Sequence, residues 1–349
     1  MLNYPKIAKA KEYQRKDGPV PVMAGRAKPK IARAFAAAFR RFRQSIDVIA
    51  LADKIKTHPH GVADILDFDG FETALRPSFV AVADAYAAGG KFAASEISDA
   101  LKKAGVRKDT TGSIEPSGSP YAFDLYTERV LSTLRQFQDT LIKELSQNSR
   151  DAVFRIVTEA ARRGEPPEAI ASDIRAAIGL TDRQMQAVSN FRRMLEDGDK
   201  AALTRDLRDQ RYDSAVRRAI DAGETPSRID EMVTAYADRY LDYRAETIAR
   251  TESVRAVNLG LHDSYQQAVD NETFPKEAIT RRWLVDLDER TCPICMAIPG
   301  LNPNGVAVDE DFVTPQGPIA DPPIHPRCRC GVQYRTNIDM LSKRFCEAA

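Results

Sequence analysis

The cysteines constrain this chain more than any other feature, because they gather in one short stretch near its C-terminal end. Four of the five lie in Cys292-Pro-Ile-Cys295 and in His325-Pro-Arg-Cys328-Arg-Cys330, and no cysteine precedes them. A disulfide framework would spread cysteines through a small secreted domain, so this clustering favours a metal site. The fifth, Cys346, stands alone and is expected to be a free thiol.

The spacing within the cluster indicates how a metal would be held. Cys292 and Cys295 place two thiolates on one side of a tight loop, which is half of a tetrahedral zinc shell with Zn–S distances of about 2.3 Å. His325, Cys328 and Cys330 compete for the other two positions. We favour His325 and Cys328, with Cys330 as the replacement for either.

Four or five mostly thiolate donors predict a structural Zn²⁺, because a catalytic zinc usually keeps three protein ligands and an open position. Disulfides from Cys292 or Cys295 to Cys328 or Cys330 are the alternative.

Other polar motifs carry less information. His58-Pro59-His60 has no cysteine or carboxylate cluster beside it and is interpreted as a loop or helix end. Arg250, Glu252 and Arg255 share one predicted helix, where a salt-bridge set is favoured over catalysis. The sequence contains no P-loop, no G-x-G-x-x-G after a strand, no H-E-x-x-H and no G-x-S-x-G. The sequence therefore shows no recognisable enzyme motif.

Positive charge is concentrated at the N-terminal end, although the net charge is only +1. Between Met1 and Gln44, twelve basic residues stand against two acidic ones, so this segment has a formal charge near +10. Such asymmetry suits a polyanion or an acidic protein surface. There is no apolar core of a signal peptide and no run of about 18 apolar residues. We expect a protein that is made and folded in a cytoplasm and has no membrane partner.

The first part of the chain divides into an arm and a helix. Residues 1–30 mix prolines and glycines with basic residues and have no stable apolar period, which predicts a basic flexible arm. From Ile31 to about Lys56, phenylalanines and isoleucines recur at helical spacing, with arginines on the other face. That basic face is interpreted as the solvated side of a core-packing helix rather than a dedicated nucleic-acid helix.

Further helices fill the middle of the chain. A helical region is predicted from about 70 to 104, with interruptions at Pro77 and at Gly89-Gly90. A long helix is predicted over 120–147 and another over 227–270, the second with a break near Tyr243. Two junctions, at Gly164 and at Gly223, combine a C-cap glycine with a proline that starts the next helix.

The texture changes after Pro275. Residues 281–285 and 330–334 alternate like strands, and the loop between Met296 and Ile324 contains six prolines. The fold class is therefore mainly α, an elongated multi-helix body with a small C-terminal α+β zinc-binding module. The predicted domains are the arm (1–30), an N-terminal helical region (31–108), a linker (109–120), a helical body (121–274) and the Cys/His metal-binding module (275–349).

One set of residues in the C-terminal part is familiar as a group. It comprises Ala249-Arg250-Thr251-Glu252, Asn258, Tyr265, Trp283, Asp288 to Cys295, Gly300, Pro322 to Pro326 and Cys328-Arg329-Cys330. In this order the residues resemble the C-terminal signature of phage head-morphogenesis minor proteins, the family of the Mu F protein. The resemblance spans about 248–334. The segment from Thr181 to Tyr243 is interpreted as a lineage-specific helical insertion.

The resemblance implies a non-enzymatic virion component, a minor capsid protein that associates with the portal protein inside the capsid near the portal vertex. It also implies contacts with major capsid or scaffold protein, and a role in head assembly, DNA packaging or ejection after synthesis in the host cytoplasm. In that setting the basic arm would bind packaged double-stranded DNA through its phosphates, or an acidic portal or scaffold surface. The helix with Arg250 and Glu252 would pack against the metal module.

Two other classes of function stay open. A zinc-stabilised nuclease or other nucleic-acid-modifying enzyme would need a catalytic histidine with carboxylates, and His262 with Asp263 is the nearest such pair in the sequence. A helical toxin-like or transferase effector with the same C-terminal module is the third possibility.

Overall fold

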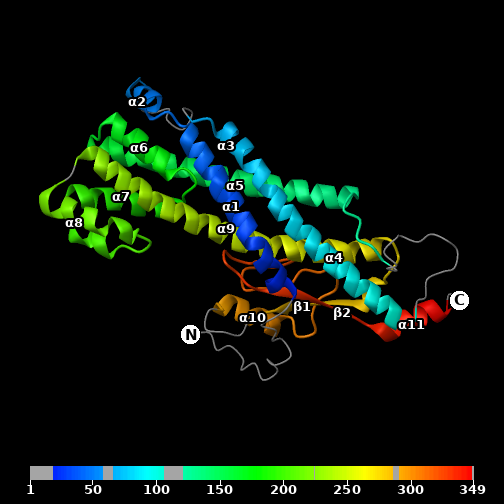
Figure 1. Cartoon of the computed structure of the whole chain (residues 1–349). Helices are drawn as coiled ribbons and strands as arrows, with labels where there is room; N and C mark the ends of the chain where they lie inside the picture. Colours follow the sequence, from blue (N-terminus) through cyan, green and yellow to red (C-terminus); the bar gives the residue numbers. More distant parts are fainter. Residues whose placement is uncertain (1–18, 58–65, 106–120, 224, 286–290, 348–349) are drawn as a thin grey trace. The chain divides into compact units, whose positions relative to one another are not determined.

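A computed structural model describes residues 19–57, 66–105, 121–223, 225–285 and 291–347 (Figure 1). In these segments the chain is mainly helical, with one two-stranded sheet near its C-terminal end, which confirms the mainly α fold class. None of the described helices has the length and apolar character needed to cross a membrane. The helices are α1 (Pro19–Ser45), α2 (Val48–Thr57), α3 (Phe68–Leu75), α4 (Phe79–Lys103), α5 (Glu128–Arg163), α6 (Pro167–Ala177), α7 (Asp182–Glu196), α8 (Asp213–Ala222), α9 (Pro226–Asp270), α10 (Pro293–Leu301) and α11 (Ile338–Glu347).

The chain forms two compact units, and each is assembled from distant parts of the sequence. Unit 1 comprises Met1–Ile31, Val80–Leu134 and Thr247–Ala349, and unit 2 comprises Ala32–Phe79 and Arg135–Glu246. Helices α1, α5 and α9 therefore each contribute residues to both units.

Helix α1 begins earlier than the sequence predicts. The arm was expected to reach residue 30, but the helix starts at Pro19, and residues 1–18 lie outside the described segments. A proline is accepted in a first helical turn because its missing N–H would have no intrahelical partner there. Val20, Ala24 and Ile31 are buried at spacings of four and seven, so the segment does have an apolar stripe.

The helix predicted over 31–56 is two helices, since α1 ends at Ser45 and Asp47 caps the start of α2. Its carboxylate accepts hydrogen bonds from the backbone N–H groups of Ile49 (2.9 Å) and Ala50 (3.2 Å). These N–H groups in the first turn of α2 have no intrahelical acceptor, and a side-chain cap satisfies them.

The predicted interruption at Pro77 is present, whereas the one at Gly89-Gly90 is not. Residues Arg76–Ser78 form a short 3₁₀ turn between α3 and α4, but α4 runs unbroken through both glycines. A Cβ at Gly89 would overlap the carbonyl oxygen of Val257, and one at Gly260 would overlap that of Tyr86. The glycines therefore allow the backbones of α4 and α9 to touch, which no larger residue permits.

The two predicted long helices are both present as helices, but their boundaries differ from the prediction. The helix expected over 120–147 starts only at Glu128 and continues to Arg163, and α9 is one helix with no break at Tyr243. Both predicted junctions are confirmed. Gly164 (φ 67°) and Gly223 (φ 73°) adopt left-handed conformations, and α6 and α9 each start at a proline shortly afterwards.

The sheet in unit 1 pairs β1 (Ile279–Leu284) antiparallel with β2 (Gly331–Thr336). Leu284 is opposite Gly331 in this register, so the last residue of β1 and the first residue of β2 lie at the same end of the sheet. The chain leaves β1 toward Cys292 and enters β2 from Cys330. Antiparallel pairing thus brings the two halves of the cysteine cluster to the same end of the sheet.

Candidate metal centre

The first half of the cluster is the start of helix α10. Cys292 is the N-cap residue, Pro293 occupies the first helical position, and the N–H of Cys295 points at the Cys292 sulfur at 3.4 Å. A helix N-terminus favours negative charge, because its N–H groups are unsatisfied and its dipole is positive. The C-x2-C sequence therefore supplies two sulfurs from a single helical turn, with a local preference for thiolate.

The second half is a tight turn in the segment that enters β2. The N–H of Cys328 donates to the carbonyl of His325 at 3.2 Å, and Arg327 between them is left-handed, with φ 62°. This turn folds His325 and Cys328 onto the same side of the chain.

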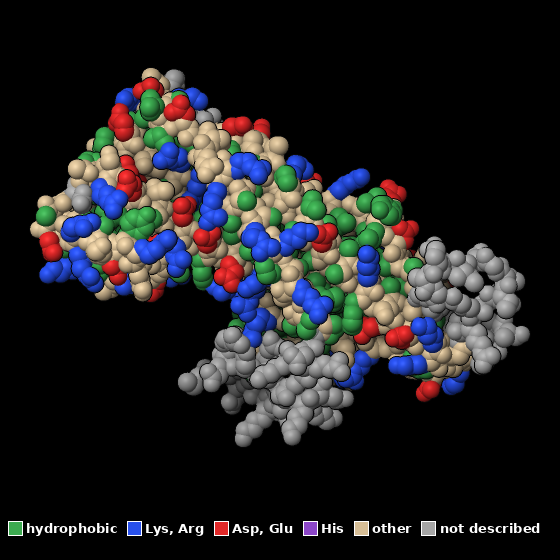
Figure 2. Space-filling model, viewed as in Figure 1, with side chains coloured by type: hydrophobic (Ala, Val, Ile, Leu, Met, Phe, Trp, Pro, Cys, Tyr) green, Lys and Arg blue, Asp and Glu red, His purple; other side chains and the backbone are tan. Residues whose placement is uncertain are grey.

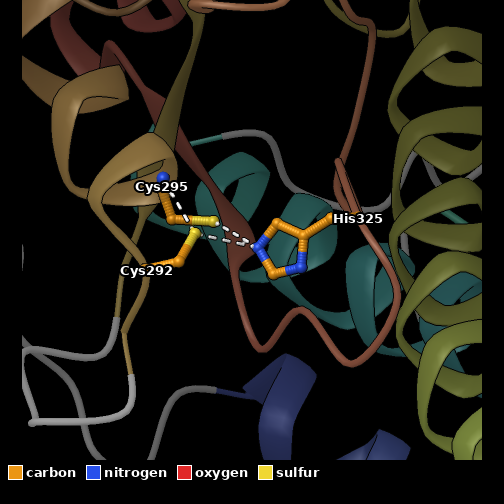
Figure 3. A group of neighbouring side chains, drawn as sticks. All are labelled: Cys292, Cys295 and His325. Atoms are coloured by element: carbon orange, nitrogen blue, oxygen red, sulfur yellow. Dashed lines mark hydrogen bonds between the residues drawn. The ribbon is translucent and has the colours of Figure 1, made fainter.

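The two halves converge on the sulfur of Cys295. His325 Nε2 lies 3.1 Å from Cys292 Sγ and 3.2 Å from Cys295 Sγ, and in Figure 3 the ring points its nitrogen between the two sulfurs. On the other side, Cys295 Sγ lies 3.8 Å from Cys328 Sγ. Donor atoms of Cys292, Cys295 and His325 form one group within 4.8 Å of one another, and those of Cys295, Cys328 and Cys330 form a second. The structure therefore brings all five predicted residues together.

All four of these cysteines are free thiols in the structure, which does not contain the alternative disulfides. Cys295, Cys328 and Cys330 are buried, and Cys292 is partly exposed.

The ring of His325 is oriented as a metal ligand would be. Its Nδ1 lies 2.9 Å from the carbonyl oxygen of Pro326, a contact that an N–H on Nδ1 satisfies. That tautomer leaves the lone pair of Nε2 directed at the sulfurs, and metal-bound histidines are commonly fixed in this way. Burial acts to lower the pKa of His325, but the Pro326 carbonyl and the neighbouring thiolates outweigh it and raise the pKa.

The thiols compete for negative charge. Hydrogen bonds from Cys295 and Cys330 hold the pKa of Cys328 well below its ordinary value, and the pKa of Cys295 is correspondingly raised. At Cys292, burial acts to raise the pKa, but the N–H of Cys295 and the His325 ring lower it overall. Several buried thiols cannot ionise together without a compensating cation, and a divalent metal provides one.

One face of helix α9 holds the Cys/His segment in place. Thr251 accepts a hydrogen bond from the N–H of Arg327 at 3.0 Å, through its hydroxyl. Asn258, fully buried, accepts from the N–H of Val332 (3.2 Å) and donates to the carbonyl of Pro322 (3.2 Å). Tyr265 stacks on Tyr334, with ring centroids 4.1 Å apart. These helix residues are seven positions apart, which places them on one face.

The neighbouring charges on α9 form the expected ion pair. Arg255 Nε lies 2.9 Å from a carboxylate oxygen of Glu252, which is itself buried. His58 and His60 lie outside the described residues, and so does the side chain of Cys346.

Sequence reasoning missed Arg281, which organises the proline-rich loop. This arginine is only 1% exposed on β1, and its guanidinium donates to the carbonyls of Ala307 (3.1 Å), Ala320 (3.0 Å) and Glu310. It also pairs with Asp321 at 3.1 Å. Alternation places Arg281 on the buried face of β1 with Ile279 and Trp283, but the strand sequence does not reveal its acceptors, which come from a loop more than twenty residues away.

The pair suggested for a nuclease is divided between two polar clusters. His262 Nδ1 lies 2.9 Å from Nη1 of Arg281 and 2.8 Å from a carboxylate oxygen of Asp321, so it belongs to the polar cluster around Arg281. Asp263 instead accepts from the hydroxyl of Tyr86 at 2.5 Å and faces Arg129 at 3.6 Å. Among the described residues, neither belongs to a group of potential metal donors.

Comparison with known proteins gives one match. Residues 210–333 match the model of a family described as Phage Mu protein F like protein. No curated protein and no solved structure matches the chain. The matched region contains all five candidate ligands, the docking face of α9 and Arg281. It begins within the segment 181–243, so the interpretation of that segment as an insertion is wrong from residue 210 onward.

Proposed function

From the Phage Mu F-like region at residues 210–333, which indicates a phage head morphogenesis protein, we propose a more specific role for this chain. It is a minor head protein of a tailed phage or prophage, bound to the portal inside the capsid, and it aids head assembly, DNA packaging or ejection. The observation that carries the proposal is the extent of the match, which covers the Cys/His cluster together with the helix that holds it.

The proposed role of the cluster is to hold one structural Zn²⁺. Cys292, Cys295 and His325 would supply three ligands, and Cys328 the fourth, with Cys330 as its alternative. The donor set fits zinc, which prefers thiolate and imidazole in a closed tetrahedral shell. Bound metal would neutralise the thiolates and link the start of α10 to the turn before β2. That link closes the proline-rich loop without a covalent bond.

The proposed partners are the portal protein, the major capsid or scaffold protein, and the packaged double-stranded DNA. Support for the DNA comes from the N-terminal part of the chain, because no acidic residue lies in α1 and the segment before it is also basic. Lys and Arg give sequence-independent, salt-sensitive affinity for phosphates. The proposed location is the capsid interior near the portal vertex, after synthesis in the host cytoplasm.

Co-assembly tests the proposal directly. The chain is expected to co-purify with the portal protein of the same phage, and to be found by mass spectrometry in DNA-filled heads. Deleting residues 2–18 should weaken salt-sensitive DNA retention while α1 stays intact. A chain that is absent from purified heads and from portal complexes would overturn the proposed role.

The proposed role requires no catalysis by this chain. Purified protein incubated with duplex DNA and Mg²⁺ or Zn²⁺ is expected to leave the DNA uncut. Reproducible cleavage that is lost in His262→Ala would favour the nuclease instead.

A further inference from the structure

A cavity of about 200 Å³ in unit 2 is lined by three arginines from two helices. Arg40, Arg43 and Gln44 come from α1, Arg175 from α6, and Asp238 from α9; Ala176 and Thr234 complete the lining. This space is open to solvent and large enough for a group the size of phosphate.

The charges around the cavity are not balanced by the protein. Arg40 pairs with Asp242, and Arg43 Nη1 lies 3.1 Å from Asp238. Arg175 is partly exposed, and among the described residues no hydrogen bond or ion pair engages its guanidinium. Three guanidinium groups against two carboxylates leave one positive charge beside the cavity.

Arg43 is the buried member of the set and is only partly satisfied. Its Nε donates to the carbonyl of Ile178 at 2.8 Å, but its buried Nη2 has no acceptor among the described residues. Burial lowers the pKa of Arg43 to about 10, against the opposing effect of Asp238. Arg43 therefore adds positive charge beside the cavity, while its own N–H groups are paired or buried within the protein.

The surroundings of the cavity on α1 are also basic. Arg33 and Arg41 are exposed on the part of α1 that belongs to unit 2, and α1 contains no acidic residue. Figure 2 shows Lys and Arg side chains along the course that α1 takes in Figure 1, with acidic ones beside them. A polyanion could therefore contact the helix surface as well as the cavity.

We propose that this arginine-lined cavity binds a phosphate group, with Arg175 as its principal donor and the positive charges of Arg40 and Arg43 beside it. A guanidinium group binds phosphate oxygens through paired N–H donors, so Arg175, which is unpaired among the described residues, suits a tetrahedral oxyanion. The source is either a phosphodiester of nucleic acid or a free phosphate compound. The three arginines lie outside the matched region 210–333. With nucleic acid as the ligand, the site rests on the proposed DNA contact of α1 and gives it a location, whereas binding of a free phosphate compound is independent of the head function.

Arg175→Gln tests the site with little risk to folding, because the replaced group makes no internal bond among the described residues. The matched control is Arg218→Gln, an exposed arginine on α8 that does not line the cavity. Inorganic phosphate is titrated calorimetrically at constant ionic strength, and a labelled short DNA duplex is titrated by fluorescence anisotropy. Melting curves of each variant verify folding.

We expect Arg175→Gln to weaken phosphate binding by about tenfold, the loss of one charge-assisted contact, and Arg218→Gln to change it by less than about twofold. Arg175→Lys should recover part of the affinity, since it keeps the charge without the fork. Duplex binding that is reduced by Arg175→Gln and displaced by phosphate identifies nucleic acid as the source. Phosphate binding with a duplex affinity indifferent to Arg175 identifies a free phosphate compound. Equal effects of Arg175→Gln and Arg218→Gln on both ligands, or no binding of either ligand, would overturn the proposal.

Discussion

Asn258 shows how one side chain can fix two separate parts of the Cys/His segment. Its amide oxygen accepts from the N–H of Val332 and its amide nitrogen donates to the carbonyl of Pro322, both in a buried setting. Asn258→Ala leaves both backbone groups without a partner, at a cost of about 1–3 kcal/mol for each. We therefore expect a clear loss in the free energy of unfolding, measured by urea denaturation.

Asn148→Ala is the matched control for that variant. The side chain of Asn148 donates only within α5, to the carbonyl of Glu144, so its loss should change the free energy of unfolding by less than about 0.5 kcal/mol. Similar effects of the two substitutions would show that Asn258 does not hold the segment.

Cys292 is the candidate ligand whose replacement tests the proposed metal most cleanly, since it is the least buried of the four clustered cysteines. Cys292→Ser removes one thiolate and is expected to lower Tm, by about 2–4 °C for each kcal/mol of stability lost. A chelator should lower the Tm of the unaltered protein and have little further effect on the variant. If the metal leaves completely and Tm does not move, the site has no structural role.

At the residue scale, the sequence predicted the candidate metal donors but not the residues that hold the Cys/His segment in place. C-x2-C and H-P-x-C-R-C identify themselves by residue type and spacing, and the structure brings all five together. Thr251, Asn258 and Tyr265 entered only through a family resemblance. The buried ion pair of Arg281 and Asp321 was not predicted from the sequence. Whether a buried charge is stable depends on hydrogen-bond and ion-pair partners that the fold brings from other parts of the chain.

At the scale of elements, the contact between α4 and α9 depends on the absence of side chains. Gly260→Ala would place a methyl group on the carbonyl oxygen of Tyr86. Overpacking of this kind typically costs about 1–3 kcal/mol and should exceed the roughly 1 kcal/mol that alanine gains over glycine in a helix. We expect a lower midpoint of urea unfolding for this variant.

Gly25→Ala makes the same glycine-to-alanine change at a position where the added methyl group has room. Gly25 is an exposed residue of α1, and a Cβ there would meet nothing within 4 Å. This substitution should stabilise the protein by about 0.5–1 kcal/mol. A destabilised Gly25→Ala, or a stabilised Gly260→Ala, would contradict the assignment of the glycines to these roles.

The same glycines explain where helix boundaries could not be predicted. A Gly-Gly pair has low helix propensity, so the local sequence favours a break, but packing of α4 on α9 outweighs that preference. Asp47 is a residue type that favours a helix N-cap, but the apolar period continues across it and predicts a single helix. The apolar periodicity of α5 and α9 predicts that these segments are helices, but it does not determine the residue at which each helix ends.

For the whole molecule, the arrangement of segments decides what can fold alone. The sequence predicts residues 275–349 as a separate metal-binding module. The structure surrounds that segment with parts from outside it. Thr251 and Asn258 bond to it, Tyr265 stacks on it, and Gly331 lies close against Val20 of α1. Unit 1 correspondingly includes three distant stretches of the chain.

These contacts predict the behaviour of an isolated fragment. Residues 275–349 contain all five candidate metal donors but none of the α1 and α9 residues that contact this segment, and a domain this small is marginal even with a complete core. With Zn²⁺ added, we expect the fragment to bind metal and yet to show poor dispersion of amide resonances and no cooperative melting. The full chain under the same conditions should melt cooperatively. A fragment with a dispersed spectrum and a sharp, metal-dependent transition would show that the metal shell alone is sufficient to fold it, and that α9 only adds stability.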